Sequence, residues 1–298
     1  MSWRNTPLGI VVGVDDSPAT RVAVQWAARD AELRNIPLTL VHAVSPEVST
    51  WWLKPPALDR LMRWQQHYGR RLLDEALKVV DEASQGGGPA GVHTEILATA
   101  AVPTLIDLSK DAELMVAGSE GSGRWPGRLL GSVSSGLLRY AHCPVAIIPD
   151  EDPSTLHPAQ APVLVGIDGS PASELATAIA FDEASRRHVG LVALYAWSDL
   201  DVSEWPGIDW PATQSMAEEV LAERLAGWQE QYPDVQVRRT VVQAQPARQL
   251  VQRSEGAQLV VVGSRGRGGF AGMLVGSVGE TVAQMARVPV IVARESVA

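Results

Sequence analysis

The sequence predicts an α/β protein of two tandem domains, each built on a doubly wound, five-stranded parallel sheet with the strand order 3-2-1-4-5. Two observations predict this class. The chain contains an internal duplication, and within each copy short β-branched runs alternate with longer amphipathic stretches. The 298 residues suffice for two domains that each bury an apolar core. We expect domains at residues 1–150 and 163–298, joined by a linker rich in proline and acidic residues at 151–162.

The duplication rests on matching segments that occur in the same order in both halves. One pair places an aspartate after an apolar run, the next contains regularly spaced glycines, and the last is an apolar run near the end of each half. Chance resemblance would not preserve this order. The matches are VVGVDDSPA (11–19) with LVGIDGSPA (164–172), GSEG (118–121) and LLGSV (129–133) with GSRG (263–266) and LVGSV (274–278), and HCPVAII (142–148) with RVPVIVA (287–293).

Five strands with helices between them are expected in each half. Right-handed crossovers between parallel strands favour a doubly wound sheet, whose ligand crevice lies where the winding reverses, between strands one and four. The expected strands lie near residues 8–14, 37–44, 91–97, 113–118 and 143–148, and near 163–168, 190–197, 235–242, 258–263 and 288–293.

Composition and charge disfavour several classes of protein. The formal net charge of −9 disfavours general binding to nucleic acid, and apolar runs such as 259–262 are too short to cross a membrane. Cys143 is the only cysteine, so no intramolecular disulfide can form, which fits a reducing compartment. The N-terminus lacks the pattern of a signal peptide. We therefore expect a cytoplasmic protein.

Both aspartates and both glycine motifs fall at the expected crevices. Asp15 and Asp168 follow strand one, and each glycine motif follows strand four with the spacing G-x-x-G, nine residues, then G-S. Glycines let a phosphate approach the main chain, and the final Gly-Ser precedes a helix whose free N–H groups attract an anion. Further candidate donors lie at the open ends of the two loops: Ser122, Arg124, Arg265 and Arg267. The motif residues are Gly118, Gly121, Gly131 and Ser132 in the first half, and Gly263, Gly266, Gly276 and Ser277 in the second.

Each motif also has an explanation that needs no ligand. The glycines would serve turns and helix ends, and the aspartates would cap the following helices, a role that Ser17 and Ser170 could fill instead. Two copies with identical spacing, each opposite an aspartate, favour a ligand. Alanine in place of Gly118 or Gly263 is then expected to weaken binding and leave the fold intact, because the methyl group would crowd the ligand.

The combination of V-D-x-S or I-D-x-S after strand one with G-x-x-G, nine residues and G-S after strand four resembles the ATP-binding branch of the universal stress protein family. The resemblance covers nearly the whole chain, twice. It implies a Rossmann-like fold of the adenine nucleotide alpha hydrolase type with one ATP per domain. It also implies a nucleotide-dependent regulator of stress response, growth or dormancy, with a regulatory protein partner and a homodimer paired through the last strand.

The resemblance assigns a role to each part of the expected sites. The aspartates would contact the adenosine part, backbone groups at the end of strand two would read the adenine edge, and the glycine motif with the residue after it would hold the phosphates. The expected nucleotide-binding residues are Gly13, Asp15, Ala43, Gly118, Gly121, Gly131, Ser132 and Val133 in the first domain, and Gly166, Asp168, Ala196, Gly263, Gly266, Arg267, Gly276, Ser277 and Val278 in the second.

Other nucleotide-binding classes lack their signatures. A dinucleotide-binding oxidoreductase needs G-x-G-x-x-G after the first strand, and no such motif stands there. A P-loop NTPase needs G-x-x-x-x-G-K-[ST], which is absent from the sequence. Six histidines occur singly, so no metal site made by protein alone is expected, although magnesium could arrive with the nucleotide. Nothing near the loops looks like a tuned general base or a positioned catalytic lysine. A regulator without catalytic residues is therefore favoured over the alternative, a slow ATPase or phosphotransferase.

The two expected sites differ in charge at one motif position. Glu120 stands inside the first glycine motif, where the second motif has Arg265. A carboxylate repels a triphosphate and a guanidinium attracts it. We therefore expect the first domain to bind ATP more weakly than the second.

Overall fold

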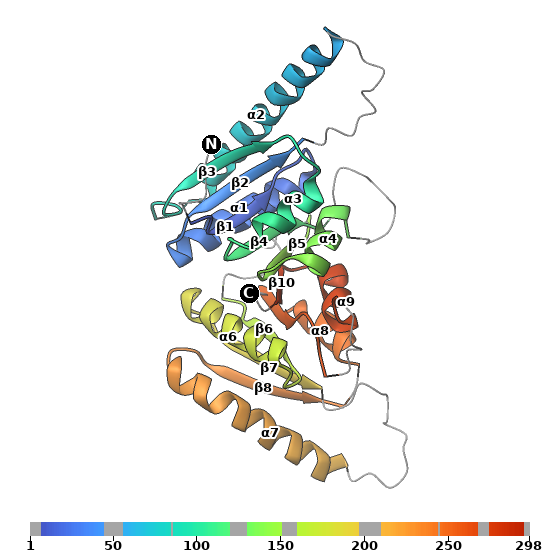
Figure 1. Ribbon diagram of the computed structural model, residues 1–298. Coiled ribbons are helices and arrows are strands. Elements are labelled where there is room, and N and C mark those ends of the chain that lie inside the picture. The colour runs from blue at the N-terminus through green and yellow to red at the C-terminus, as the bar shows by residue number, and fades with distance from the viewer. Residues whose placement is uncertain are drawn as a thin grey trace. The chain divides into compact units, whose positions relative to one another are not determined.

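The computed structural model describes residues 7–44, 56–84, 86–119, 130–150, 160–196, 210–243, 245–267 and 274–294 (Figure 1). The chain divides into two compact units, one running from Met1 to Asp150 and the other from Glu151 to Val297. Each unit is an α/β domain with five parallel strands, as the sequence predicted.

The first unit is a doubly wound sheet with the order β3-β2-β1-β4-β5, which confirms the predicted fold class and strand order. All of its neighbouring strands run parallel. The strands are β1 (Ile10–Gly13), β2 (Leu38–Ala43), β3 (Val92–Leu97), β4 (Leu114–Gly118) and β5 (Val145–Ile148), and the helices are α1 (Pro18–Arg34), α2 (Ala57–Ala83), α3 (Ala101–Leu108) and α4 (Ser132–Tyr140).

The second unit repeats this topology with the order β8-β7-β6-β9-β10. Its neighbouring strands are likewise parallel. The strands are β6 (Val163–Ile167), β7 (Leu191–Ala196), β8 (Val237–Val242), β9 (Leu259–Gly263) and β10 (Val290–Ala293), and the helices are α6 (Pro171–Arg186), α7 (Trp210–Gln231), α8 (Pro246–Ser254) and α9 (Ser277–Met285).

The central strands are continuous apolar runs because helices cover both faces of each sheet. Ile10, Val11 and Val12 of β1 are fully buried, as are Val163 and Val165 of β6. In the first unit α1 packs against α2 and α3 against α4, and in the second unit α8 packs against α9. The apolar core of each unit therefore lies between a sheet and its helices.

The winding of each sheet reverses between its first and fourth strands. In the first unit Ile10 of β1 pairs with Leu114 of β4. In the second, Val163 of β6 pairs with Leu259 of β9. The loops that follow these strands therefore meet at the same edge of the sheet, where ligands of doubly wound folds bind. Among the described residues, no helix is long and apolar enough to cross a membrane.

Candidate functional site

A cavity of about 880 Å³ lies at the switch point of the second unit, and all nine site residues predicted for that domain line it. They come from the ends of β6, β7 and β9 and from the start of α9, so segments far apart in the sequence converge on one space. The volume is within the range of small-molecule sites. The nine residues are Gly166, Asp168, Ala196, Gly263, Gly266, Arg267, Gly276, Ser277 and Val278.

The N-terminus of α9 forms one wall of this cavity and offers unpaired donors. Gly276 is the N-cap, and its N–H donates to the Ser264 carbonyl oxygen at 2.7 Å. The N–H groups of Ser277, Val278 and Gly279, at the first three helical positions, have no acceptor among the described residues. A helix start with free N–H groups attracts an anion through hydrogen bonding and the helix dipole.

Gly276 keeps the space between this helix and the preceding loop open. A Cβ built on Gly276 would lie 3.5 Å from the Arg265 Cα and 3.7 Å from the Gly266 nitrogen, ordinary contact distances. The backbone of Gly276, at φ −79° and ψ 152°, is one that any residue adopts. A methyl group would therefore fit at this position, and it would fill part of the space where a phosphate would meet the helix.

Asp168 connects the loop after β6 to the glycine loop after β9. Its Oδ1 accepts from the Ser170 N–H at 2.8 Å, and its Oδ2 accepts from the Arg267 N–H at 3.1 Å. Ser170, the N-cap of α6, takes the capping role, because its hydroxyl oxygen accepts from the Ser173 N–H at 3.2 Å. The Ser170 hydroxyl also donates to the Arg265 carbonyl oxygen at 3.0 Å. Asp168 is thus not the helix cap, and its carboxylate faces the loop.

The side chain of Arg267 lies over β7. Its guanidinium carbon is 5.6 Å from the centre of the Tyr195 ring, and its Nη1 is 3.5 Å from the Tyr195 hydroxyl oxygen. Cation–π contact and this long hydrogen bond hold the side chain beside the cavity. Arg267 therefore lines the cavity beside Tyr195 and Asp168.

Two of the predicted glycines have a packing role that the sequence analysis missed. A Cβ on Gly263 would lie 2.8 Å from the Ala172 carbonyl carbon and 3.0 Å from the Ser173 nitrogen. A Cβ on Gly118 would lie 2.6 Å from the Ala19 Cβ. The first turns of α6 and α1 thus pack directly on these strand ends. The expectation that alanine at either position leaves the fold intact is wrong, because the methyl group would collide with the helix.

Two further predicted glycines also leave room for leucine side chains. A Cβ on Gly13 would lie 3.2 Å from a methyl of Leu105 in α3, and one on Gly166 would lie 3.0 Å from a methyl of Leu250 in α8. Gly166 additionally lines the second-unit cavity. Close packing of these helices on the strand ends is therefore one reason for glycine at both positions.

The N-terminus of α4 in the first unit has the same arrangement as the N-terminus of α9 in the second. Gly131 is the N-cap of α4, and its N–H donates to the Ser119 carbonyl oxygen at 2.9 Å, as Gly276 does to Ser264. Ser132 and Val133 begin the helix, and Ala43 ends β2. Gly121 and Glu120 lie outside the described residues.

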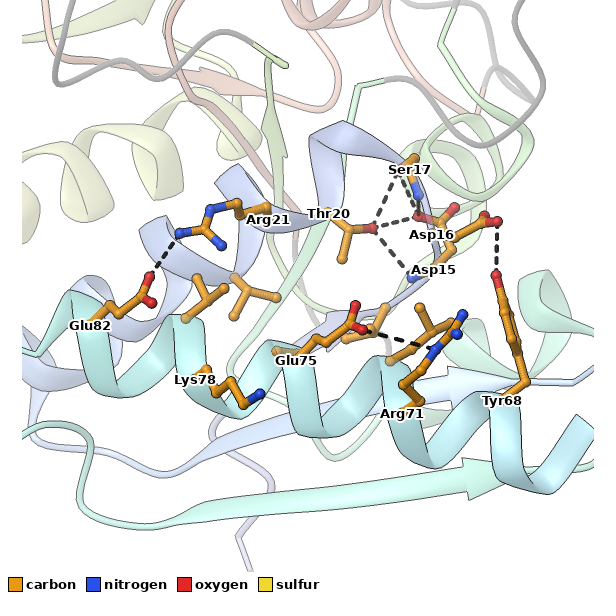
Figure 2. A pocket seen from close by; sticks show the side chains of 15 residues that line it. Asp15, Asp16, Ser17, Thr20, Arg21, Tyr68, Arg71, Glu75, Lys78 and Glu82 are labelled. Carbon is orange, nitrogen blue, oxygen red and sulfur yellow. Dashed lines mark hydrogen bonds and ion pairs between the residues drawn. The ribbon is translucent and has the colours of Figure 1, made fainter.

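Asp15 is engaged differently from its counterpart Asp168. Its Oδ1 accepts from the N–H and the hydroxyl of Ser17 and from the hydroxyl of Thr20 (Figure 2). The carboxylate is therefore bound to the first turn of its own helix. Ser17 is the N-cap residue of α1, but its side chain makes no capping hydrogen bond to that helix.

Asp15 also lines a groove of about 430 Å³ between α1 and α2 (Figure 2). A hydrogen bond and an ion pair join residues that line this groove. The Tyr68 hydroxyl donates to Asp16 at 2.9 Å, and Arg21 contacts Glu82 at 2.7 Å. The hydrogen bond to Asp16 is the main cause that raises the pKa of Tyr68. Gly118 and Gly131 do not line this groove, so it differs from the crevice expected in the first domain.

The sequence analysis did not predict the contribution of α8 to the second-unit cavity. Gln245, Pro246, Arg248 and Leu250 line it. The backbone of Gln245 is left-handed (φ 58°, ψ 57°), which a non-glycine residue rarely adopts, and this conformation is visible only in the structure. In the sequence alone this segment carries no repeated motif, since the first repeat has Ala100 and Pro103 at the positions of Gln245 and Arg248.

These features define a tandem doubly wound α/β protein with an anion-attracting helix start at the switch point. The sequence model of the universal stress protein family matches residues 9–149 and 161–294. A universal stress protein of Mycobacterium tuberculosis strain H37Rv is 77% identical over 296 residues, covering 99% of each chain. A second one from this strain is 55% identical over 296 residues, covering 99% of this chain and 100% of the relative. The chain belongs to the universal stress protein family.

A solved structure shares the fold over both domains. The crystal structure of a universal stress protein from Archaeoglobus fulgidus has a TM-score of 0.70 at 21% identity, covering 97% of this chain and 98% of that one. At this identity the likeness concerns the fold alone.

Proposed function

We propose that this universal stress protein is an ATP-binding regulator that holds one ATP in each domain. The observation that carries the proposal is the second-unit cavity, which brings together Asp168, the glycine loop and the N-terminus of α9. A carboxylate acceptor on one side and free N–H donors on the other suit the hydroxyl groups and the phosphates of a nucleotide.

Each part of the cavity has a proposed role. Asp168 accepts from a hydroxyl or amine of the adenosine, and backbone groups at Ala196 contact the adenine edge. The N–H groups of Ser277 and Val278 donate to the phosphates, and Arg267 adds positive charge at the open end. Asp15, Ala43, Gly131, Ser132 and Val133 would do the same in the first domain.

Magnesium is proposed to enter bound to the phosphates of the nucleotide, and not to occupy a site made of protein side chains alone. Among the described residues, no group of three or more His, Cys, Asp and Glu side chains could hold a metal ion. Phosphate oxygens are the usual ligands through which Mg²⁺ joins a nucleotide site, with few protein ligands. The ion would reduce repulsion between the phosphates and the carboxylates nearby.

A regulatory role is proposed in preference to catalysis. The described residues that line the cavity include no lysine and no histidine, and their carboxylates are Asp168 and Glu255. The Asp168 carboxylate is already engaged, because it accepts hydrogen bonds from two backbone N–H groups. We propose that bound ATP changes the preference of a cytoplasmic, homodimeric protein for a regulatory partner in stress response, growth or dormancy.

Isothermal titration of ATP with magnesium into the wild type and Gly276→Ala tests the proposal. The wild type should bind two ATP per chain. Gly276→Ala should bind one, or bind the second at least about tenfold more weakly, because the methyl group fills the phosphate space beside Arg265. Gly227→Ala is the matched control, since a Cβ at Gly227 on α7 meets no atom within 4 Å. Identical titrations of the wild type and Gly276→Ala would contradict the assigned site.

A further inference from the structure

The first turn of α8 places a charged side chain in the second-unit cavity that no glycine motif predicts. Arg248 lines the cavity together with Gln245, the N-cap residue of α8. The Arg248 Nη1 donates to the Gln245 Oε1 at 3.3 Å. The amide of Gln245 therefore restrains a guanidinium that is otherwise exposed to solvent.

The backbone of Gln245 is unusual and differs between the repeats. Gln245 has φ 58° and ψ 57°, in the left-handed region, whereas its counterpart Ala100 is extended, with φ −63° and ψ 133°. Non-glycine residues in this region are strained, and such strain is concentrated at functional sites. Glycine would relieve the strain at this position, but it would also remove the amide oxygen that accepts from Arg248.

Arg248 belongs to a set of three arginines in this cavity, with Arg265 and Arg267. Gly118 and Gly263, which begin the two glycine motifs, are 145 residues apart. With this offset the positions of the three arginines are occupied in the first repeat by Pro103, Glu120 and Ser122. The cavity of the second domain thus carries three arginines at positions where the first domain has no basic residue, although the glycine loop of the first domain has Arg124 and Arg128 where the second has Gly269 and Met273. The asymmetry extends over three positions and two separate segments of the chain.

We propose that Arg248, positioned by Gln245, binds an anionic group of the nucleotide and makes the second domain selective for nucleotides with more phosphate groups. This inference rests on the proposed function. A guanidinium presents a planar set of donors that matches phosphate oxygens. Each added phosphate increases the negative charge of the nucleotide and therefore strengthens its attraction to Arg248. The first domain, without these arginines, discriminates less between ATP, ADP and AMP.

The test needs a signal from the second cavity alone. Met285 lines that cavity, so the NMR shift of its methyl group, labelled with carbon-13 and assigned through Met285→Leu, reports binding there. ATP, ADP and AMP are titrated separately into the wild type, Arg248→Gln and Arg253→Gln. Arg253 is the matched control, because it lies on the same helix, is exposed and does not line the cavity.

Arg248→Gln should weaken ATP binding about tenfold and AMP binding by less than about threefold, because one charge interaction with the phosphate chain is lost. Arg253→Gln should match the wild type. Gln245→Gly should lower the ratio of ATP to AMP affinity in the same direction, without reducing the free energy of unfolding, because glycine tolerates the left-handed backbone.

Three contrary outcomes are distinguishable. A Met285 methyl that responds to nucleotides equally in the wild type and Arg248→Gln overturns this inference and leaves the proposed function standing. A loss of affinity that is the same for ATP and AMP overturns it as well, since Arg248 would then act on the cavity as a whole. A methyl that responds to none of the three nucleotides in the wild type overturns both.

Discussion

Asp168 accepts a hydrogen bond from the backbone N–H of Arg267 at 3.1 Å, although the two residues are 99 positions apart in the chain. The same carboxylate accepts from Ser170 at the start of α6. One side chain therefore ties the loop after β6 to the glycine loop after β9, across the point where the sheet changes direction. The carboxylate that we assign to the ligand also organises the loop that we assign to its phosphates.

Replacing Asp168 with alanine should weaken ATP binding in the second domain by about tenfold or more. Two backbone N–H groups lose their acceptor, and the free energy of unfolding should fall by about 1 kcal/mol. Titration and urea unfolding measure the two effects. Asp182→Ala is the control, because Asp182 forms a partly exposed ion pair with Arg186 on α6. Unchanged second-site affinity in Asp168→Ala would show that the carboxylate serves the loop only.

Alanine at Gly263 should destabilise the second domain, in contrast with alanine at Gly276. The Gly263 methyl group would lie 2.8 Å from the Ala172 carbonyl carbon, so α6 must shift, at a cost of about 1–3 kcal/mol. The Gly276 methyl group would make ordinary contacts, and the change should stay within about 0.5 kcal/mol. Urea unfolding of both variants decides this. Equal stabilities would mean that the packing of α6 on β9 is looser than the structure shows.

The contrast between these glycines shows how far the sequence could predict the molecule. The duplication and the alternation of apolar runs predicted the strand order, because parallel crossovers have one hand. The same reasoning placed Gly263 at the switch point. It could not tell that α6 packs tightly on Gly263 while a methyl group on Gly276 would make only ordinary contacts, since that depends on how closely neighbouring backbone segments approach each other. Gly263 and Gly276 are both glycines of one motif, so the sequence alone does not distinguish their roles.

Side-chain networks were the other part that the sequence could not predict. Asp15 and Asp168 stand in matching segments, yet Asp15 bonds to Ser17 and Thr20, and Asp168 bonds to Ser170 and Arg267. The position of Thr20 is Ser173 in the second repeat. Both hydroxyls accept from the N–H of the aspartate before them, but the Thr20 hydroxyl also donates to the Asp15 carboxylate. Small differences near a motif that both repeats share redirect its hydrogen bonds. The Gln245–Arg248 pair lay in a segment without any repeat.

Hydrolysis of ATP should be far slower than in a dedicated enzyme. The described cavity residues include no lysine or histidine to activate water or stabilise a leaving phosphate, so turnover should stay well below about 1 per second with magnesium present. Release of phosphate, measured with purified protein and with Gly276→Ala as control, tests this. Turnover above that rate that disappears in Gly276→Ala would favour an ATPase or phosphotransferase.

The first domain should bind ATP more weakly than the second, and Glu120→Arg should strengthen it. Glu120 lies outside the described residues, and the prediction rests on its position in the motif, where the second domain has Arg265. The measurement uses a Gly276→Ala background, so that the first site is observed alone. Affinity should rise by about tenfold at low salt and less at high salt, because screening weakens the interaction. An unchanged affinity at low salt would show that Glu120 does not act on the phosphates.

The central claim, one ATP in each domain, is tested most directly by a native mass spectrum of the protein after incubation with ATP and magnesium and removal of the excess. The predicted spectrum shows each chain carrying two ATP molecules, and the same spectrum for Gly276→Ala shows one. Chains of wild-type protein that carry no nucleotide under these conditions would contradict the assignment of both sites.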